Sequence, residues 1–200
     1  MPAERIFTSG EATALYLQQR APDASLFVVG TPSLEDEFRS HGFRLVMDHP
    51  DYIVLGFDTT LTYAKLWKLC NLVRTGIPYI ATHPDYNCPT KGGYMPDVGA
   101  VIAFVEASTG RRPDIVIGKP NAPIVHALAK RTGFPVDRLT MVGDRLYTDI
   151  ALGKTGMQTV LVLSGETKLE RVNLSPFQPD HIVANLGELK DRLQVLIRNI

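Results

Sequence analysis

The sequence predicts an α/β fold in which a mostly parallel sheet has helices on both faces. Short apolar runs alternate with stretches of helical periodicity almost to the end of the chain. Turn sequences with Gly and Pro, such as RTGIP and RTGFP, separate the two kinds of stretch. Strands joined by helices of this length form βαβ units, and such units build parallel sheets.

The predicted strands are the short apolar runs, a pattern typical of buried strands. In chain order they are residues 26–30, 52–57, 78–81, 114–118, 139–143, 159–163 and 181–183. The predicted helices are the stretches in which apolar residues recur three and four positions apart. In chain order they are residues 11–19, 34–41, 63–74, 97–109, 121–131, 147–154 and 186–197.

The best internal boundary is STGRRPD, residues 108–114, which combines Gly, Pro and two arginines. A smaller α/β module is expected before it, at residues 8–112. The second part is expected at residues 113–200, together with 1–7, and its pattern is typical of half of a nucleotide-binding fold.

Composition argues against several classes of partner. Lys+Arg and Asp+Glu both total 21, so the formal net charge is zero, and this balance disfavours nucleic acid or an anionic membrane. No apolar stretch approaches the length of a membrane span, and the N-terminus lacks the order of a signal peptide. Cys70 and Cys88 show neither metal-ligand spacing nor a disulfide framework, which favours a cytoplasmic protein.

The strongest chemical signal is in LTMVGDRLYTDIALGKTGM, residues 139–157. The predicted strand ends at Gly143, Asp144 follows at its carboxyl end, and Asp149 lies in the first turn of the next helix. Such strand ends line the ligand crevice of a doubly wound sheet, and two carboxylates there can hold Mg²⁺ together with water and phosphate. The alternative is purely structural, with Asp144 turning the chain and Asp149 capping the helix.

A second signal is in VIGKPNAPIVHAL, residues 116–128. Lys119 leaves a predicted strand just before a helix whose start is marked by Pro120, Asn121 and Pro123. An ammonium group there can bind a phosphate and offset its repulsion by nearby carboxylates. GKP alone equally suits a solvated loop lysine, but its place ahead of the GDxxxTD turn favours a phosphate-binding role.

These two motifs, in this order, resemble the last two motifs of the haloacid dehalogenase (HAD) superfamily. The likeness covers nearly all 200 residues and is closest to the type IIA hydrolases, which are NagD-like or p-nitrophenyl phosphatase-like. TSGEATALYL, IATHPD and GYMPDVGAVIAFVEASTGRRP are similar to the cap domain of that subfamily. The resemblance implies part of a HAD-like Rossmannoid core, with a parallel sheet, and an α/β type IIA cap. It also implies a Mg²⁺-dependent phosphatase that acts through an aspartyl-phosphate.

Carried over residue by residue, the resemblance assigns catalytic roles to Lys119 and Asp149. It assigns the metal to Asp144 and Asp149, and substrate binding to Lys119, Asn121 and Asp85. Asp85 lies in the long polar loop at 82–97, which by resemblance hangs from the cap over the active site. An ordinary surface position is an equally open interpretation for any single residue of that loop.

The nucleophile and general acid of the family come from a DxDG segment that precedes the cap, and this sequence contains no such segment. Asp58, in GFDTTLTY, follows a predicted strand and imitates that nucleophile. We interpret it as a look-alike, because the position two residues later is Thr60, which cannot protonate a leaving group, and no glycine follows. Some superfamily members carry Thr at the second position, so a nucleophilic Asp58 stays open as the alternative.

The expected function is hydrolysis of a phosphorylated small molecule, with the nucleophile segment missing from this chain. Two alternatives are open: a catalytically inactive module that binds a phosphorylated ligand or a partner chain, and a truncated fragment of the full enzyme. In this fold the missing strand would lie beside the strand that ends at Gly143. Its absence would leave an open sheet edge and an apolar face, which predicts poor solubility or a homodimer.

Overall fold

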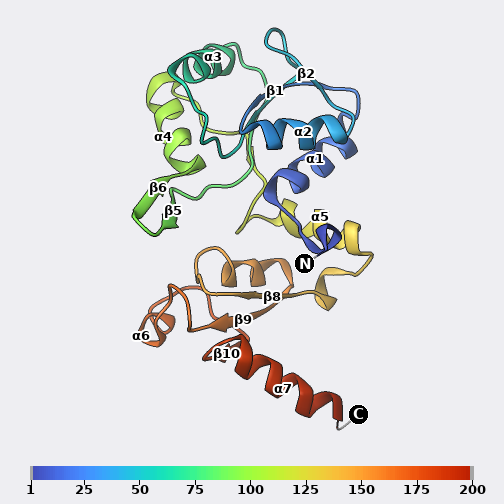
Figure 1. Ribbon diagram of the computed structural model, residues 1–200, viewed down its shortest axis with the longest axis vertical. Coiled ribbons are helices and arrows are strands. Elements are labelled where there is room, and N and C mark those ends of the chain that lie inside the picture. The colour runs from blue at the N-terminus through green and yellow to red at the C-terminus, as the bar shows by residue number, and fades with distance from the viewer. Residues whose placement is uncertain (1, 199–200) are drawn as a thin grey trace. The chain divides into compact units, whose positions relative to one another are not determined.

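The computed structural model describes residues 2–198, which fall into two compact units (Figure 1). The first unit extends to Gly118, and the second begins at Lys119. The sequence placed the boundary a few residues earlier, ahead of 113. Assignment of the two units to a cap and a core stays a prediction.

A five-stranded parallel sheet forms the centre of the first unit. Its strand order is β2-β1-β3-β4-β7, and every neighbouring pair is parallel. The strands are β1 (Ser25–Val29), β2 (Arg44–Leu45), β3 (Tyr52–Leu55), β4 (Tyr79–Ala81) and β7 (Ile115–Val116). The chain reverses its direction across the sheet between β1 and β3, which makes the carboxyl ends of these two strands the topological switch point.

Helices cover both faces of this sheet. Helices α1 and α2 lie together on one side, and α3 and α4 lie together on the other (Figure 1). Their bounds are α1 (Ser9–Arg20), α2 (Pro32–Ser40), α3 (Tyr63–Arg74) and α4 (Val98–Thr109), and a short 3-10 helix, η1 (Ala3–Arg5), precedes them. Each α-helix starts at a side chain that accepts a backbone N–H and so satisfies one exposed donor of the first turn. These N-cap residues are Thr8, Thr31, Thr62 and Asp97.

An antiparallel hairpin projects between β4 and α4. It consists of β5 (Asn87–Thr90) and β6 (Gly93–Pro96), and most of its residues are exposed. The backbone amide of Asp97 donates to the carbonyl oxygen of Tyr86 at 2.9 Å and closes the base of the hairpin.

The second unit contains a three-stranded parallel sheet in the order β10-β9-β8. The strands are β8 (Thr140–Gly143), β9 (Gln158–Val162) and β10 (His181–Val183). The helical segments are α5 (Ala122–Thr132), η2 (Val136–Arg138), η3 (Ile150–Thr155), α6 (Leu169–Val172) and α7 (Leu186–Arg198). Apolar residues of α5 and η3 pack together with Met141 and Met157 in one core cluster, while Leu189 of α7 packs against Val142, Val160 and Val183. No helix within residues 2–198 is both long and apolar enough to cross a membrane.

The α/β prediction with a parallel sheet is confirmed. Two local predictions are corrected. The stretch at 82–97 is not all loop, because it contains the β5–β6 hairpin. The helix expected at 147–154 is instead a turn followed by the 3-10 helix η3, in which Gly153 and Thr155 have low helix propensity.

Candidate active site

The strongest sequence motif folds into a tight turn at the carboxyl end of β8. The backbone amide of Asp149 donates to the carbonyl oxygen of Arg145 at 3.0 Å. In return, Asp149 Oδ2 accepts hydrogen bonds from the backbone amides of Asp144 and Arg145, both at 3.2 Å. The Asp149 side chain therefore closes the turn and holds the backbone of residues 144 and 145 in place.

Lys119 is the ion-pair partner of this turn. Its Nζ lies 2.5 Å from Asp149 Oδ1, and the two side chains are 40% and 5% exposed, respectively. A buried carboxylate requires such compensation, and here both of its oxygens receive donors. The ammonium group has three N–H donors, and the pair with Asp149 uses one of them. The more exposed cation can therefore still bind an anion such as phosphate.

Asp144 is held by a different segment, the loop that follows β9. Its Oδ2 accepts a hydrogen bond from the backbone amide of Glu166 at 2.7 Å. Its carbonyl oxygen accepts from the amide of Thr167 at 3.2 Å. Within residues 2–198, Asp144 Oδ1 has no protein partner. One oxygen of this carboxylate is thus fixed, and the other is available.

Two glycines allow these carboxylates to lie against the backbone. A Cβ atom on Gly143 would overlap the carboxyl group of Asp149, and a Cβ atom on Gly165 would overlap that of Asp144. Neither glycine has a positive φ. Glycine is therefore needed at both positions for close approach and not for an unusual backbone conformation.

The donor set at this turn fits a small hard cation. Mg²⁺ is bound by one or two carboxylates and takes its remaining ligands from water and phosphate oxygens. Asp144 offers an available oxygen in a cradle that a Cβ at position 165 would fill. Asp149 lies on the same turn, but Lys119 and two backbone amides already engage its oxygens. The two aspartates named by the sequence therefore have unequal access to a metal ion.

The other predicted substrate contacts are less directly placed. Asn121 is the N-cap residue of α5, and its side chain makes no capping hydrogen bond. Asp85 belongs to the first unit, where it precedes β5 and lies near His83 and Asp97. The structure therefore brings Lys119, Asp144 and Asp149 together, and it does not show a shared site for Asp85.

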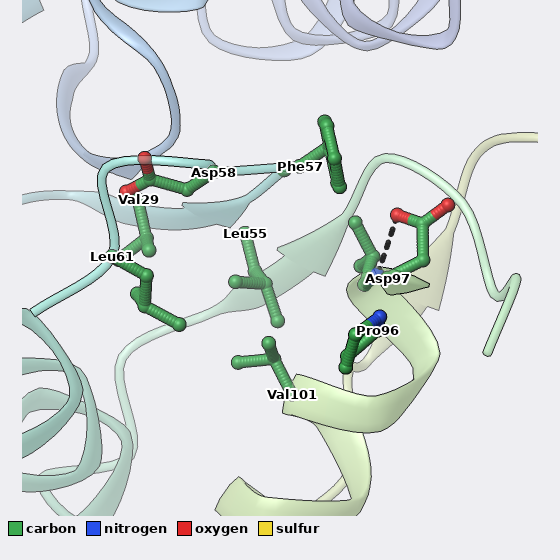
Figure 2. Close-up of a pocket in the computed structure, with 10 residues that line it drawn as sticks. Val29, Leu55, Phe57, Asp58, Leu61, Pro96, Asp97 and Val101 are labelled. Atoms are coloured by element: carbon green, nitrogen blue, oxygen red, sulfur yellow. Dashed lines mark hydrogen bonds between the residues drawn. The ribbon is translucent and has the colours of Figure 1, made fainter. Parts of the chain in front are cut away.

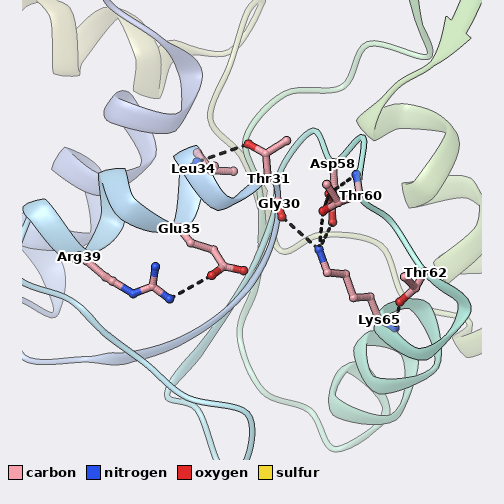
Figure 3. A network of polar contacts seen from close by, with 9 residues as sticks. All are labelled: Gly30, Thr31, Leu34, Glu35, Arg39, Asp58, Thr60, Thr62 and Lys65. Atoms are coloured by element: carbon pink, nitrogen blue, oxygen red, sulfur yellow. Dashed lines mark hydrogen bonds and ion pairs between the residues drawn. The ribbon is translucent and has the colours of Figure 1, made fainter.

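Asp58, which the sequence predicts to be a look-alike of the nucleophile, lies in the first unit beyond the carboxyl end of β3, and both of its carboxylate oxygens have partners. Its Oδ1 accepts hydrogen bonds from the amide and hydroxyl of Thr60, at 2.8 and 2.6 Å. Its Oδ2 lies 2.6 Å from Lys65 Nζ, which also contacts the carbonyl oxygen of Gly30 at 3.3 Å (Figure 3). The network ties the carboxyl ends of β1 and β3 to α3, and it occupies both oxygens of the Asp58 carboxylate.

A small pocket lies beside Asp58. Figure 2 shows it bordered by Asp58, Asp97 and apolar side chains such as Leu55 and Val101. Its volume is about 80 Å³. Sites for small organic ligands usually occupy ~300–1,000 Å³, so this pocket is too small for a phosphorylated substrate.

Sequence reasoning missed two contributors to these networks. Lys65 follows Asp58 by seven positions. The segment of Gly165 and Glu166 follows β9, whose carboxyl end lies at the same edge of the sheet as the end of β8 that precedes Asp144. The position of Gly165 near Asp144 could have been predicted from the sequence alone, because the carboxyl ends of neighbouring parallel strands lie at the same edge of the sheet. Lys65 carried no such signal, since a lysine on an exposed helix face is ordinary.

Comparison with known proteins gives matches that include the residues of this turn. Residues 116–189 match the model of the HAD-hydrolase-like family. The dihydroxyacetone phosphatase of Corynebacterium glutamicum is 33% identical over 192 residues, which cover 96% of this chain and 70% of that protein. The chain belongs to the HAD-like phosphatases. Among other members, the 5'-nucleotidase YutF of Bacillus subtilis is 34% identical over 186 residues, covering 92% of this chain and 72% of that one.

A solved structure extends the likeness to the fold of the HAD-like phosphatases. The crystal structure of a 4-nitrophenylphosphatase from Thermotoga maritima has a TM-score of 0.90 and 47% identity, and the match covers 94% of this chain and 73% of that one. These matches confirm the membership that the sequence motifs predicted. The relatives carry the names of three different phosphatase activities, so membership among the HAD-like phosphatases leaves the substrate open.

Proposed function

We propose that this chain serves in a Mg²⁺-dependent phosphatase that hydrolyses a phosphate monoester of a small molecule through an aspartyl-phosphate. The observation that carries the proposal is the arrangement of Lys119, Asp144 and Asp149 around one turn at the end of β8. Family membership supports the reaction class. Both cysteines are free thiols, which supports a cytoplasmic location for the enzyme.

Each of the three residues has a distinct proposed role. Lys119 binds the substrate phosphate through its remaining N–H donors. Asp149 keeps the Lys119 ammonium group in place, and Asp144 would provide the direct protein ligand for Mg²⁺. When bound, Mg²⁺ would neutralise phosphate charge and polarise the phosphoryl oxygen as a Lewis acid.

We assign the nucleophile to a DxDG segment outside these 200 residues. The sequence contains no such motif, and both oxygens of Asp58 are engaged by Thr60 and Lys65. An aspartate paired in this way is a poor nucleophile, because attack on phosphorus would require it to leave its partners.

Turnover of 4-nitrophenyl phosphate with and without Mg²⁺ tests this proposal. The 200-residue chain is expected to show negligible turnover, and activity should appear when a family segment that contains DxDG precedes it. In that longer protein, Lys119→Ala should lower kcat/KM by at least about 100-fold, an effect on the order of 2.7 kcal/mol in transition-state stabilisation. Asp58→Asn and the exposed control Lys190→Ala should retain activity.

Robust Mg²⁺-dependent turnover by the 200-residue chain that is abolished by Asp58→Asn would contradict the proposal. A second candidate function is a binding module without catalysis, favoured by the lack of a DxDG motif in the sequence. In that case inorganic phosphate would bind in the presence of Mg²⁺, and turnover would be absent even from the longer protein.

A further inference from the structure

Three potential metal ligands converge at the base of the β5–β6 hairpin, in the first unit. His83 and Asp85 precede β5, and Asp97 follows β6. One ligand atom of each residue lies within 4.8 Å of the ligand atoms of the other two. The side chains of His83 and Asp97 are only 17% and 10% exposed. The cluster therefore combines an imidazole and two carboxylates from both ends of one projecting element.

Backbone contacts hold the ligands in position. The amide of Gly99 donates to the carbonyl oxygen of Asp85 at 2.8 Å, in addition to the bond between Asp97 and Tyr86 that closes the hairpin. A Cβ atom at position 99 would overlap the carbonyl oxygen of Pro84, so glycine allows α4 to pack directly against this segment. Main-chain contacts thus fix the two ends of the hairpin, and side-chain contacts are not needed to bring the three ligand residues together.

The distance between the first two ligands already suits a shared ion. His83 Nε2 lies 2.9 Å from Asp97 Oδ1. Ligand atoms about 2.0–2.2 Å from one ion at tetrahedral or right angles are separated by about 2.9–3.5 Å. Nδ1 of the same ring lies 3.0 Å from the hydroxyl of Thr82, an arrangement that orients the imidazole as second partners do in metal sites.

The carboxylate of Asp85 is the part of this cluster that the hydrogen bonds within the protein do not account for. In the part of the chain that the structure describes, its carboxylate has no hydrogen-bond or ion-pair partner. It is partly buried and lies beside a second carboxylate, that of Asp97. Two anionic groups held together repel each other, and a divalent cation between them would remove that repulsion.

We propose that His83, Asp85 and Asp97 bind a divalent first-row transition ion, with Zn²⁺ as the ion to be tested. A site that mixes imidazole with carboxylates favours such an ion over Mg²⁺, which prefers oxygen ligands alone. Three protein ligands leave one coordination position for water. The ion joins both ends of the hairpin. Because most residues of the hairpin are exposed, side-chain packing contributes little to fixing its position, and the ion would provide that constraint.

Calorimetric titration of the chain with Zn²⁺ tests the proposal. One saturable site is expected, and Asp85→Asn should weaken it by at least about 100-fold, because loss of second-shell partners alone costs 10–100-fold. Asp85→Asn keeps the side-chain volume, and a melting curve equal to that of the unchanged chain would show that it folds. The controls Asp23→Asn and His126→Ala, at exposed positions, should bind Zn²⁺ unchanged.

Hydrogen exchange provides a second measurement. Zn²⁺ should slow exchange of the amides between residues 87 and 96, and Asp85→Asn and His83→Asn should abolish that protection. Asp144→Asn should bind Zn²⁺ as the unchanged chain does. Absence of saturable binding, equal binding by Asp85→Asn, or loss of binding in Asp144→Asn would each overturn the proposal. The last result would place Zn²⁺ at the turn after β8, and none of these outcomes depends on phosphatase activity.

Discussion

At the scale of single residues, Asp144 and Asp149 illustrate how one motif gives two carboxylates different tasks. Both lie on one turn, and each is held by backbone amides. Asp149 is buried beneath Lys119, so the negative charge of its carboxylate is paired with the Lys119 ammonium group. Asp144 has one carboxylate oxygen without a protein partner among the described residues, so this oxygen can bind a ligand such as a cation. The difference comes from the Lys119 segment, which precedes the motif in the chain.

This difference gives the first prediction. Asp144→Asn should weaken Mg²⁺ binding by at least about tenfold, since a neutral amide attracts a hard cation far less than a carboxylate does. Its melting temperature should change little, because the Asn oxygen can still accept from Glu166. Calorimetry with Mg²⁺ measures the affinity, and Asp191→Asn on the exposed face of α7 serves as the matched control. Equal Mg²⁺ affinity in Asp144→Asn would show that the metal ligand lies elsewhere.

At the scale of elements, both parallel sheets use an aspartate to attach the start of one strand to its neighbour. Asp51 Oδ2 accepts from the amide and hydroxyl of Ser25, at 2.8 and 2.7 Å, ahead of β3. Asp180 Oδ2 accepts from the amide and hydroxyl of Thr159, at 2.7 and 2.9 Å, ahead of β10. In each case the backbone hydrogen bond is the main cause that lowers the pKa of the aspartate.

The lowered pKa of Asp180 gives a prediction with a definite pH dependence. The folded state favours the charged carboxylate, so its stabilisation is present above the usual aspartate pKa of about 3.9 and is lost as the pH falls through the lower folded value. Asp180→Ala should therefore lower the melting temperature by a few degrees at pH 7. The difference from the unchanged chain should shrink toward zero as the pH falls well below about 3.9.

Thermal melts of Asp180→Ala between neutral and strongly acidic pH check this expectation. Asp23→Ala removes an exposed aspartate and should leave the melting temperature unchanged across the same range. If the melting temperature of Asp180→Ala stayed lower than that of the unchanged chain by the same amount down to the lowest pH, packing and not the charged hydrogen bonds would account for the loss of stability.

Comparison of individual elements shows what the sequence could and could not predict. The helix at 63–74 and the strand at 181–183 were predicted with their observed bounds, because periodicity and apolar runs report burial directly. The β5–β6 hairpin was missed, since its exposed strands contain Pro89 and Pro96 and no apolar alternation.

The same physical limits apply to the sites. Lys119, Asp144 and Asp149 were predicted to lie together because of their spacing within strand-to-helix turns, and their contacts bring them to one turn, while their roles stay a prediction. The proximity of His83, Asp85 and Asp97 was not predicted, since only the closure of the hairpin brings Asp97 beside the other two. Contacts across a projecting element leave no periodic trace in a sequence.

At the scale of the molecule, the second unit has a sheet face that is only partly covered. Strand β8 is an edge strand among the described residues, and a groove of about 750 Å³ lies between the sheet and α7. Val142 and Val160 line its floor, and Leu193 and Leu196 of α7 line its wall. Leu193 and Leu196 are 48% and 60% exposed. An apolar groove beside an open edge favours association.

We therefore expect the 200-residue chain to self-associate through this face. Sedimentation should show a concentration-dependent dimer or larger species, and Leu193→Glu should shift the chain toward monomer by placing a charge in the groove. Leu174→Glu, at a residue that is 86% exposed and outside the groove, is the matched control and should leave association unchanged. A cooperative monomer at all concentrations would contradict this expectation.

The glycine pair at positions 143 and 165 has a genetic consequence. Every missense change in a glycine codon adds a Cβ atom, and at these two codons that atom would enter the space of a carboxyl group proposed for the active site. No amino acid is a conservative replacement there, whatever its polarity. Gly92 has open space around its Cβ direction and lacks a positive φ, so its codon is free of the same restriction. In a library of random variants of the longer protein that contains DxDG, selected for phosphatase activity, codons 143 and 165 should accumulate only synonymous changes, while codon 92 should also accept missense changes.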